Sequence, residues 1–455
     1  MSADHTALDG RRARVCRSVS AWLLIVLTCG VASAQESVEI VFSSQPSPVG
    51  AGARATGVGS AFIAVADDAT AASWNPGGLT QLDRPEMSVV ARGIAQFDEL
   101  GDGTRTFDTG ESTSAAGQSD SFATGSLNYL SVAIPFSVIG RNLVAALNYQ
   151  QVLSFERDLH FRFDNDSPGF HSFTNAHLVQ AGGVDAVTPA LAFTVAPGLS
   201  LGAAFNYWID GLGHDFAWRE TFEQSGAFEV EGFTQPTSGS FQDTFQHFRG
   251  ANGTIGLLWD VTDEVALGAV WKTPFTAHVH HVARSPSDPS FPVQRQRHRM
   301  QLPASYGIGA RWRPSDQLTL STDVTWVDWA HFRTVSSTGE EFLVTGDLAS
   351  TDTVDGVFTE RVGAEYVWLL PEAKLTARTG LFFDPEPSRG APRPFYGGSL
   401  GFGVTLASVS VDLAYQVRAG LAAKHTSVAT QLVDIPSVEL DTVQNLFYLS
   451  IVEYL

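Results

Sequence analysis

Apolar and polar residues alternate with a period of two along many short segments of this chain. In residues 409–418, for example, Val411 and Leu413 fall on one face, and Asp412 and Gln416 fall on the other. Successive side chains of a strand point to opposite faces, so this pattern predicts β-strands with one face in an apolar medium and one in a polar medium.

The alternating segments are arranged as hairpins. The predicted strands are residues 87–97, 126–136, 141–156, 185–196, 199–210, 252–260, 264–277, 302–313, 317–330, 357–369, 373–383, 397–406, 409–418 and 443–455. Very short turns join twelve of them in pairs, near residues 137–140, 197–198, 261–263, 314–316, 370–372 and 407–408. Long polar segments separate the hairpins, and we expect them to be loops: residues 98–125, 157–184, 211–251, 278–301, 331–356, 384–396 and 419–442.

Strict alternation of short turns and long loops is typical of outer-membrane barrels, whose short turns face the periplasm. A soluble β-sandwich has no reason to place every long loop at one end. The sequence therefore predicts an all-β fold, a 14-stranded antiparallel transmembrane β-barrel in the outer membrane of a Gram-negative bacterium. Its outward faces would contact outer-membrane lipid.

Aromatic residues cluster near the ends of the predicted strands. They include Tyr129, Trp271, Trp312, Trp326, Trp329, Tyr366 and Trp368. Aromatic rings concentrate at membrane–water interfaces, so we expect these residues to form girdles around the barrel. The alternative is packing inside an ordinary sandwich core.

The first 34 residues have the pattern of a secretory signal peptide. Arginines from Arg11 to Arg17 precede an apolar run at 21–27, and Ala32-Ser33-Ala34 provides a cleavage site. The alternative is a membrane anchor, but the apolar run is much shorter than the roughly 20 residues that a spanning helix needs. We expect the mature chain to start near Gln35.

The composition excludes several kinds of chemistry. Both cysteines, Cys16 and Cys29, lie in the predicted signal peptide, so the mature chain would have no disulfide and no reactive thiol. A formal net charge of −20 argues against a nucleic-acid surface. We predict no cofactor, and the sequence contains no phosphate-binding Gly-Lys-Ser/Thr loop.

The sequence also offers little support for catalysis or metal binding. The one G-x-S-x-G match, around Ser399, opens a predicted strand instead of joining a strand to a helix, so it lacks the context of a hydrolase. We therefore do not expect an enzyme. Histidines that suggest a metal lack a recognised spacing, and we expect them to lie at the loop rim: His278, His280, His281 and His298.

Residues 35–86 precede the first predicted strand and are rich in glycine and alanine, which allow close packing. They also carry Phe62, Ile63 and Trp74. A piece this small must pack against something else, and a 14-stranded barrel has a lumen that wall side chains cannot fill. We therefore expect an N-terminal plug, or hatch, in the lumen.

This segment also carries a family resemblance. GARATGVGSAFIAVADDATAASWNPGGLTQLDRPEMSV (52–89) resembles the hatch of the outer-membrane long-chain fatty acid transporter family (the FadL type, which includes aromatic-hydrocarbon transporters). Ala66-Asp67-Asp68-Ala69 and Asn75-Pro76 match the family pattern, and Gly77 stands where alanine is usual. Residues 302–329 and 377–387 are also similar to family segments.

The resemblance implies three parts: a signal peptide (1–34), a hatch (35–86) and a barrel (87–455). It also implies passive passage of apolar molecules, long-chain fatty acids above all, past the hatch and out through a lateral opening, without ATP. The partners would be hydrophobic small molecules, and no obligate protein partner is predicted. The alternative is a barrel with a structural or interaction role, in secretion or surface attachment.

Candidate gating residues lie in the predicted hatch. Asn75-Pro76-Gly77 reads as a tight turn, since proline fixes φ and glycine tolerates positive φ. We expect this turn to shift when ligand binds; the alternative is a purely anchoring turn. Asp67 and Asp68 are expected either to pair with lumenal arginines or to cap a turn.

Two further groups are candidate ligand contacts. By face parity Arg311, Arg361, Arg378 and Arg418 point inward, where Arg311 and Arg378 are predicted to bind a fatty carboxylate, with structural ion pairs as the alternative. Aromatic residues in two predicted loops would form an apolar capture groove unless they pack loop against loop: Phe170, Phe173, Phe216, Trp218, Phe222, Phe228 and Phe233.

Overall fold

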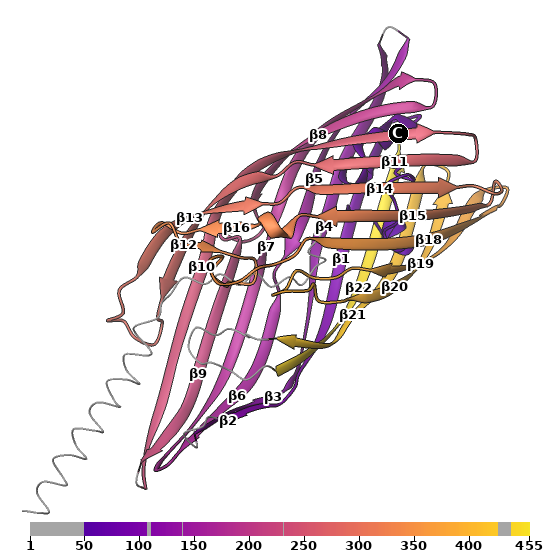
Figure 1. Ribbon diagram of the computed structural model, residues 1–455. Helices are drawn as coiled ribbons and strands as arrows, with labels where there is room; N and C mark the ends of the chain where they lie inside the picture. Colours follow the sequence, from indigo (N-terminus) through magenta and orange to yellow (C-terminus); the bar gives the residue numbers. More distant parts are fainter. Residues whose placement is uncertain (1–49, 107–110, 139, 231, 426–437) are drawn as a thin grey trace, which may run out of the picture.

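Fourteen antiparallel strands close into one ring in the described part of the chain, residues 50–106, 111–138, 140–230, 232–425 and 438–455 of this computed structural model (Figure 1). In ring order they are β1 (Glu86–Leu100), β4 (Ser119–Val138), β5 (Arg141–Ser154), β7 (Phe170–Ala196), β8 (Leu199–Asp210), β10 (Phe233–Asp260), β11 (Val265–Lys272), β14 (Ser305–Trp312), β15 (Leu318–Val327), β18 (Val357–Leu369), β19 (Ala373–Phe383), β20 (Tyr396–Leu406), β21 (Val409–His425) and β22 (Val438–Tyr454). The ring closes where β1 pairs with β22, from Glu86 opposite Tyr454 to Leu100 opposite Leu440. The predicted strand number and the six short turns are confirmed.

The prediction that the long segments are loops is wrong for most of 98–125, 157–184, 211–251 and 278–301, whereas 331–356 and 384–396 are loop for most of their length. The long segments contain β2 (Gly103–Thr106), β3 (Ser112–Gly117), β6 (Arg157–Ser167), β9 (Trp218–Val230), β12 (Phe275–Arg284), β13 (Gln294–Leu302), β16 (Arg333–Val335) and β17 (Glu341–Phe342). Together with the first halves of β7 and β10, these strands form a second continuous sheet, which we call the rim sheet. Figure 1 shows β6, β7, β9 and β10 extending well beyond the ring of wall strands.

The wall exposes apolar side chains and buries polar ones. In β21, Val411 and Leu413 are 39% and 55% exposed, whereas Asp412 and Gln416 are 3% and 2% exposed. Inversion of the usual soluble pattern is what a lipid-facing wall with a polar lumen requires. Within the described residues, no helix is long and apolar enough to cross a membrane.

The predicted aromatic girdle is present in part. Aromatic rings lie side by side across four neighbouring strands, from Trp271 through Tyr306 and the half-buried Trp326 to Phe358, with centroid distances of 6.5, 5.8 and 6.3 Å. Trp312 and Trp368 are also exposed. The prediction was wrong for two residues that we expected in the girdle. Tyr129 is fully buried and points into the lumen, and Trp329 is buried in η2 (Trp329–His331).

Residues 50–82 lie within the ring of strands. They form α2 (Ala53–Gly57), α3 (Ala71–Trp74) and η1 (Pro76–Gln81), and nearly all of their side chains are buried. Their backbone and side chains hydrogen-bond to strands on every side of the wall: Ser450 of β22, Ser399 of β20, Asp323 of β15, Leu257 of β10, Ser200 of β8 and Tyr129 of β4. The predicted signal peptide and residues 35–49 lie outside the described residues.

Glycines in the wall let this segment approach the strands closely. A Cβ atom on Gly256 of β10 would lie 2.1 Å from Asn75 Oδ1, and one on Gly380 of β19 would lie 2.2 Å from the amide nitrogen of Gly59. Real Cβ contacts are never this short, so the two backbones pack against each other only because these wall positions are glycine.

The inward orientation predicted for four arginines is confirmed, and all four pair with carboxylates: Arg311 with Asp260, Arg361 with Asp384, Arg378 with Glu365 and Asp412, and Arg418 with Asp384. The guanidinium group of Arg418, which is fully buried, also stacks 3.8 Å from the ring centroid of Phe395. Buried charges need such partners because an unpaired one would be strongly destabilising.

We expect Arg418→Met to lower the free energy of unfolding by about 3 kcal/mol, because Asp384 and Glu386 would lose a buried partner. Arg389→Met is the matched control: Arg389 pairs with Asp347 and Asp352 but is 42% exposed, so its loss should cost less than about 1 kcal/mol. Urea unfolding of the barrel in lipid vesicles measures both values. Equal effects of the two substitutions would contradict the prediction.

Candidate functional site

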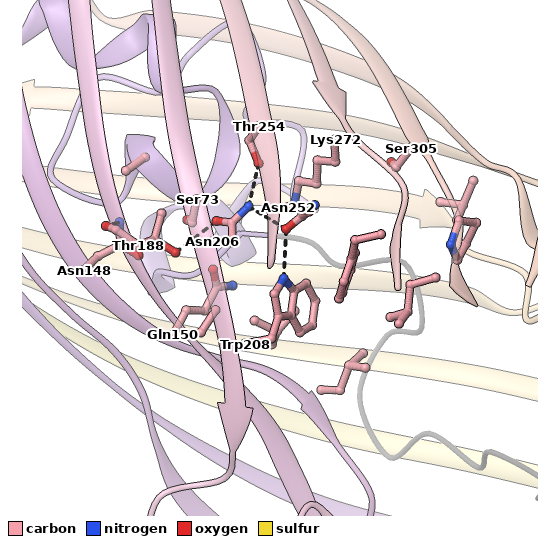
Figure 2. Close-up of a pocket in the computed structure, with 18 of the residues that line it drawn as sticks. Ser73, Asn148, Gln150, Thr188, Asn206, Trp208, Asn252, Thr254, Lys272 and Ser305 are labelled. Atoms are coloured by element: carbon pink, nitrogen blue, oxygen red, sulfur yellow. Dashed lines mark hydrogen bonds between the residues drawn. The ribbon is translucent and has the colours of Figure 1, made fainter. Parts of the chain in front are cut away.

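A cavity of about 780 Å³, including the open solvent at its mouth, lies between residues 50–82, which we call the hatch segment, and the strands of one half of the wall (Figure 2). Ala72 and Ser73 of α3 form its base. The wall contributes residues of β5, β7, β8, β10 and β11: Asn148, Gln150, Val152, Leu153, Ala186, Thr188, Asn206, Trp208, Asn252, Thr254 and Lys272. Segments that lead to the rim sheet and to η2 complete it: Phe275, Leu302, Pro303, Ser305, Val327 and Trp329.

One side of the cavity is a network of neutral polar groups. The amide of Asn206 accepts a hydrogen bond from Thr188 Oγ1 at 2.9 Å and donates to Asn252 Oδ1 at 3.0 Å. The indole of Trp208 donates to the same Asn252 oxygen at 2.8 Å, as Figure 2 shows. These side chains satisfy one another's hydrogen-bonding groups, so the network does not require a charged or strongly hydrated occupant.

The opposite side is apolar. Leu153, Trp208, Val327 and Trp329 belong to one buried hydrophobic cluster, and Phe275 and Leu302 pack against it. This cluster continues into the rim sheet through Trp218 and Phe245. An occupant would therefore meet hydrocarbon on one side and amides and hydroxyls on the other.

Lys272 is the one charged residue among the described residues that line the cavity. It lies at the end of β11, close to the turn into the rim sheet. A second cavity, of about 450 Å³ including the open solvent at its mouth, shares Lys272, Ser73 and Ser305 with the first, so the two spaces adjoin. The second cavity runs between the hatch segment, at Ile63 and Trp74, and strands β11, β14, β15 and β18.

The predicted hatch turn is tied to the wall by Asn75, which is fully buried. Its Nδ2 donates to the carbonyl oxygens of Ile63 and of Leu257 in β10, both at 2.9 Å, and its Oδ1 accepts from the Gly77 amide at 3.0 Å. Pro76 begins η1, where its missing N–H costs nothing. Gating by Asn75, Pro76 and Gly77 stays a prediction, but the geometry makes Asn75 the link between turn and wall.

Both predicted aspartates contact Arg54, Asp68 at 3.7 Å, and their other partners differ. Asp67 Oδ1 accepts from Arg54 at 2.5 Å, and its other oxygen lies 3.4 Å from Arg313 of the wall. Asp68 instead accepts from the amide and hydroxyl of Thr70, which is a turn-capping role. Burial raises the pKa of Asp68 despite the nearby Arg54.

Arg54 links the hatch segment to the charged side of the wall. It donates to Glu365 at 2.9 and 3.0 Å, and Glu365 in turn accepts from Arg378 at 2.6 Å. Arg311 donates to Gln81 of the hatch segment and to Asp260. Neither Arg311 nor Arg378 lines either described cavity. The sequence alone therefore did not separate arginines that brace the hatch from residues that border the cavity.

The predicted capture aromatics lie away from the cavity. Phe170 and Phe173 are in β7, Trp218, Phe222 and Phe228 are in β9, Phe233 begins β10, and Phe216 precedes β9. None of them lines a described cavity. Trp218 is buried against Phe155 and Phe245, whereas Phe233 is 65% exposed. The ligand role of these residues stays a prediction, but most of them lie in strands of the rim sheet, where we expected loops.

Two groups set aside in the sequence also have defined positions. Ser399 accepts a hydrogen bond from the Gly59 amide and donates to the Gly57 carbonyl oxygen, so its hydroxyl holds the hatch segment. The histidines expected in loops at the rim are in strands β12 and β13 of the rim sheet. Burial lowers the pKa of His298 to about 4, with a contribution from neighbouring His281.

The model of one protein family, described as outer membrane protein transport protein (OMPP1/FadL/TodX), matches residues 47–396. The chain belongs to this family. Membership places it among Gram-negative outer-membrane barrels and supports transport of hydrophobic compounds across that membrane. No curated protein matches the chain.

Solved structures of other proteins share the fold. A Pseudomonas aeruginosa FadL homologue is 15% identical, with a TM-score of 0.59, and the match covers 89% of this chain and 98% of that one. The Pseudomonas putida toluene transporter TodX is 13% identical, with a TM-score of 0.49, over 90% of this chain and 99% of that one. At this identity the likeness to the FadL homologue shows the shared fold of this FadL/TodX family member.

We expect Asn75→Asp to loosen the hatch, because a carboxylate cannot donate to the two carbonyl oxygens that the amide now binds. Hydrogen exchange of the backbone amides at 62–79 should become at least about tenfold faster, since each buried unsatisfied group costs about 1–3 kcal/mol. Asn142→Asp is the control, because Asn142 also donates to a hatch carbonyl, that of Thr80, but is exposed. Unchanged exchange in Asn75→Asp would contradict the anchoring role.

Proposed function

We propose that this protein conducts long-chain compounds with a polar end across the outer membrane, with long-chain fatty acids as the best candidates. The observation that carries this proposal is the two-sided lining of the cavity above α3. An apolar wall faces a side of amides and hydroxyls, and a single lysine lies at one end. Transport would be passive, along the substrate's own concentration gradient.

The apolar side suits an alkyl chain. Removal of a methylene group from water stabilises the bound state by about 0.8 kcal/mol, so a chain that covers several of these side chains gains enough to bind reversibly. The cavity rests on the hatch segment and adjoins the second cavity beside it. An occupant that moved from one to the other would pass Ser73, Lys272 and Ser305.

Lys272 supplies the cation that a carboxylate requires. A hydrogen bond to an ionised partner contributes about 1.5–3 kcal/mol, which corresponds to roughly a tenfold to hundredfold gain in affinity. Toluene, the compound named for the TodX structure, has no group for this lysine or for the asparagines. The polar lining therefore favours an amphipathic substrate over a pure hydrocarbon.

The cavity also suggests how the hatch responds. Ala72 and Ser73 belong to α3, and Asn75 follows directly as the link to β10. A ligand that displaces α3 would strain the hydrogen bonds of Asn75 first. Such coupling needs a ligand that prefers the displaced state, and an alkyl chain longer than the cavity is such a ligand.

Uptake of labelled oleate tests the proposal in cells that lack their own fatty acid channel. Wild-type protein should restore oleate uptake. The double variant Asn75→Ala, Pro76→Ala should change the rate of uptake because its hatch is altered, provided that the variant is as abundant and as well folded as wild-type protein. If folded wild-type protein restores nothing, fatty acids are the wrong substrate. Aromatic hydrocarbons and a search for a protein partner, which the alternative structural or interaction role requires, would then be the next tests.

Substitution of Lys272 separates charge recognition from apolar binding. Lys272→Met should weaken oleate binding to the purified protein at least about tenfold while binding of hexadecane stays within about twofold. Lys374→Met is the control and should leave both unchanged, because Lys374 is exposed at the start of β19 and lines neither cavity. Equal oleate affinity in wild-type protein and Lys272→Met would contradict the role of this lysine.

A further inference from the structure

Two histidines and two aspartates meet on the rim sheet, far from the residues that line the cavities. His160 of β6 and His177 of β7 are directly opposite in the antiparallel register. Asp158 lies two residues before His160 and therefore on the same face of β6. Asp120 reaches the group from β4.

Three of the four side chains, those of Asp158, His160 and His177, are close enough to share one ion. Asp158 Oδ1 lies 2.7 Å from His177 Nε2 and 3.8 Å from His160 Nδ1. One ligand atom each from Asp158, His160 and His177 all lie within 4.8 Å of one another. The two imidazole rings stack with centroids 3.9 Å apart and planes 11° from parallel, so one ring would rotate on its side-chain bonds to direct its nitrogen at a shared ion.

Asp120 holds His160 in place. Its Oδ2 accepts the backbone N–H of His160 at 2.6 Å, and its Oδ1 lies 2.8 Å from the ring Nδ1. Because Asp120 occupies Nδ1, the nitrogen of His160 that remains for an ion is Nε2. A carboxylate against the other ring nitrogen is the usual support for metal-ligating histidines, because it fixes the orientation of the ring. Asp120 is mostly buried, whereas the other three side chains are 32–44% exposed, which leaves room for water ligands.

We propose that Asp158, His160 and His177 bind a divalent first-row transition ion of the zinc class, with Asp120 as the supporting carboxylate. Two imidazole nitrogens favour zinc, nickel or copper over magnesium or calcium, which prefer all-oxygen sites. A histidine binds a metal ion through a neutral imidazole, so a bound divalent ion would offset the charges of the two carboxylates. Three protein ligands with open positions complete a common coordination pattern.

The ion would strengthen a junction that has little backbone support. In the described residues β4 pairs with β1 and β5, and β6 pairs with β3 and β7, so no ladder joins β4 to β6. The contacts of Asp120 with His160 connect these two strands. A bound ion would therefore fasten the β6–β7 hairpin to a strand of the wall.

A zinc titration of the untagged, full-length protein in detergent tests the proposal. After removal of metal with a chelator, competition with a chromophoric indicator gives the number of ions bound and their affinity. Wild-type protein should bind one ion that His160→Gln, His177→Gln does not bind. Cobalt should give visible absorption bands with wild-type protein that the double variant lacks.

The same hairpin provides a matched control. His171 Nδ1 lies 2.6 Å from Asp166 Oδ1, but this pair belongs to no three-ligand group in the described part of the chain. His171→Gln should therefore retain the ion. Asp158→Asn preserves the shape of the side chain and should weaken zinc binding at least tenfold. This variant replaces the double histidine variant in the test if the latter fails to fold, as judged by heat-modifiable mobility. Identical zinc binding in wild-type protein and folded His160→Gln, His177→Gln, or no binding by wild-type protein, would overturn the proposal.

Discussion

The structure depends on one constraint: inside a bilayer, every backbone N–H and C=O must be paired within the protein. A sheet meets this requirement only when it closes, and closure here rests on the long ladder between β1 and β22. Closure also creates a lumen that the wall side chains cannot fill. The need for a hatch follows from the same constraint that dictates the barrel.

The polar groups that line the lumen determine how the hatch packs against the wall. Asp323 accepts the amides of Phe62 and Ile63, and Tyr129 and Ser131 both donate to the carbonyl oxygen of Ala69. The short helices of the hatch leave many backbone groups unpaired, and inward-facing side chains of the wall satisfy them. The wall and the hatch therefore complete each other's hydrogen bonding.

Local pattern was sufficient to predict the wall strands and their turns, because burial alternates with every residue along each strand. It was not sufficient for the rim sheet. Its strands are polar on much of their surface, and their pairing depends on partners as distant as Ser112 and Asp166. The same reason hid the residues that we propose bind a metal ion, since His160 and His177 meet only through the register of β6 and β7. Lys272 stood in a predicted strand, but no local signal marks which inward residues border a cavity.

Charged side chains are distributed unevenly around the lumen, and this distribution suits transport. Ion pairs of Arg361, Arg378 and Arg418 lie on β18 to β21, where Arg54 fastens the hatch. The cavity lies on the other half, against β5 to β11, where neutral asparagines and threonines satisfy one another. An apolar molecule that displaced water from buried carboxylates would remove solvation that nothing replaces, whereas paired amides lose little. The half with the ion pairs can therefore hold the hatch, while the half with the cavity, whose one charged lining residue among those described is Lys272, admits hydrocarbon.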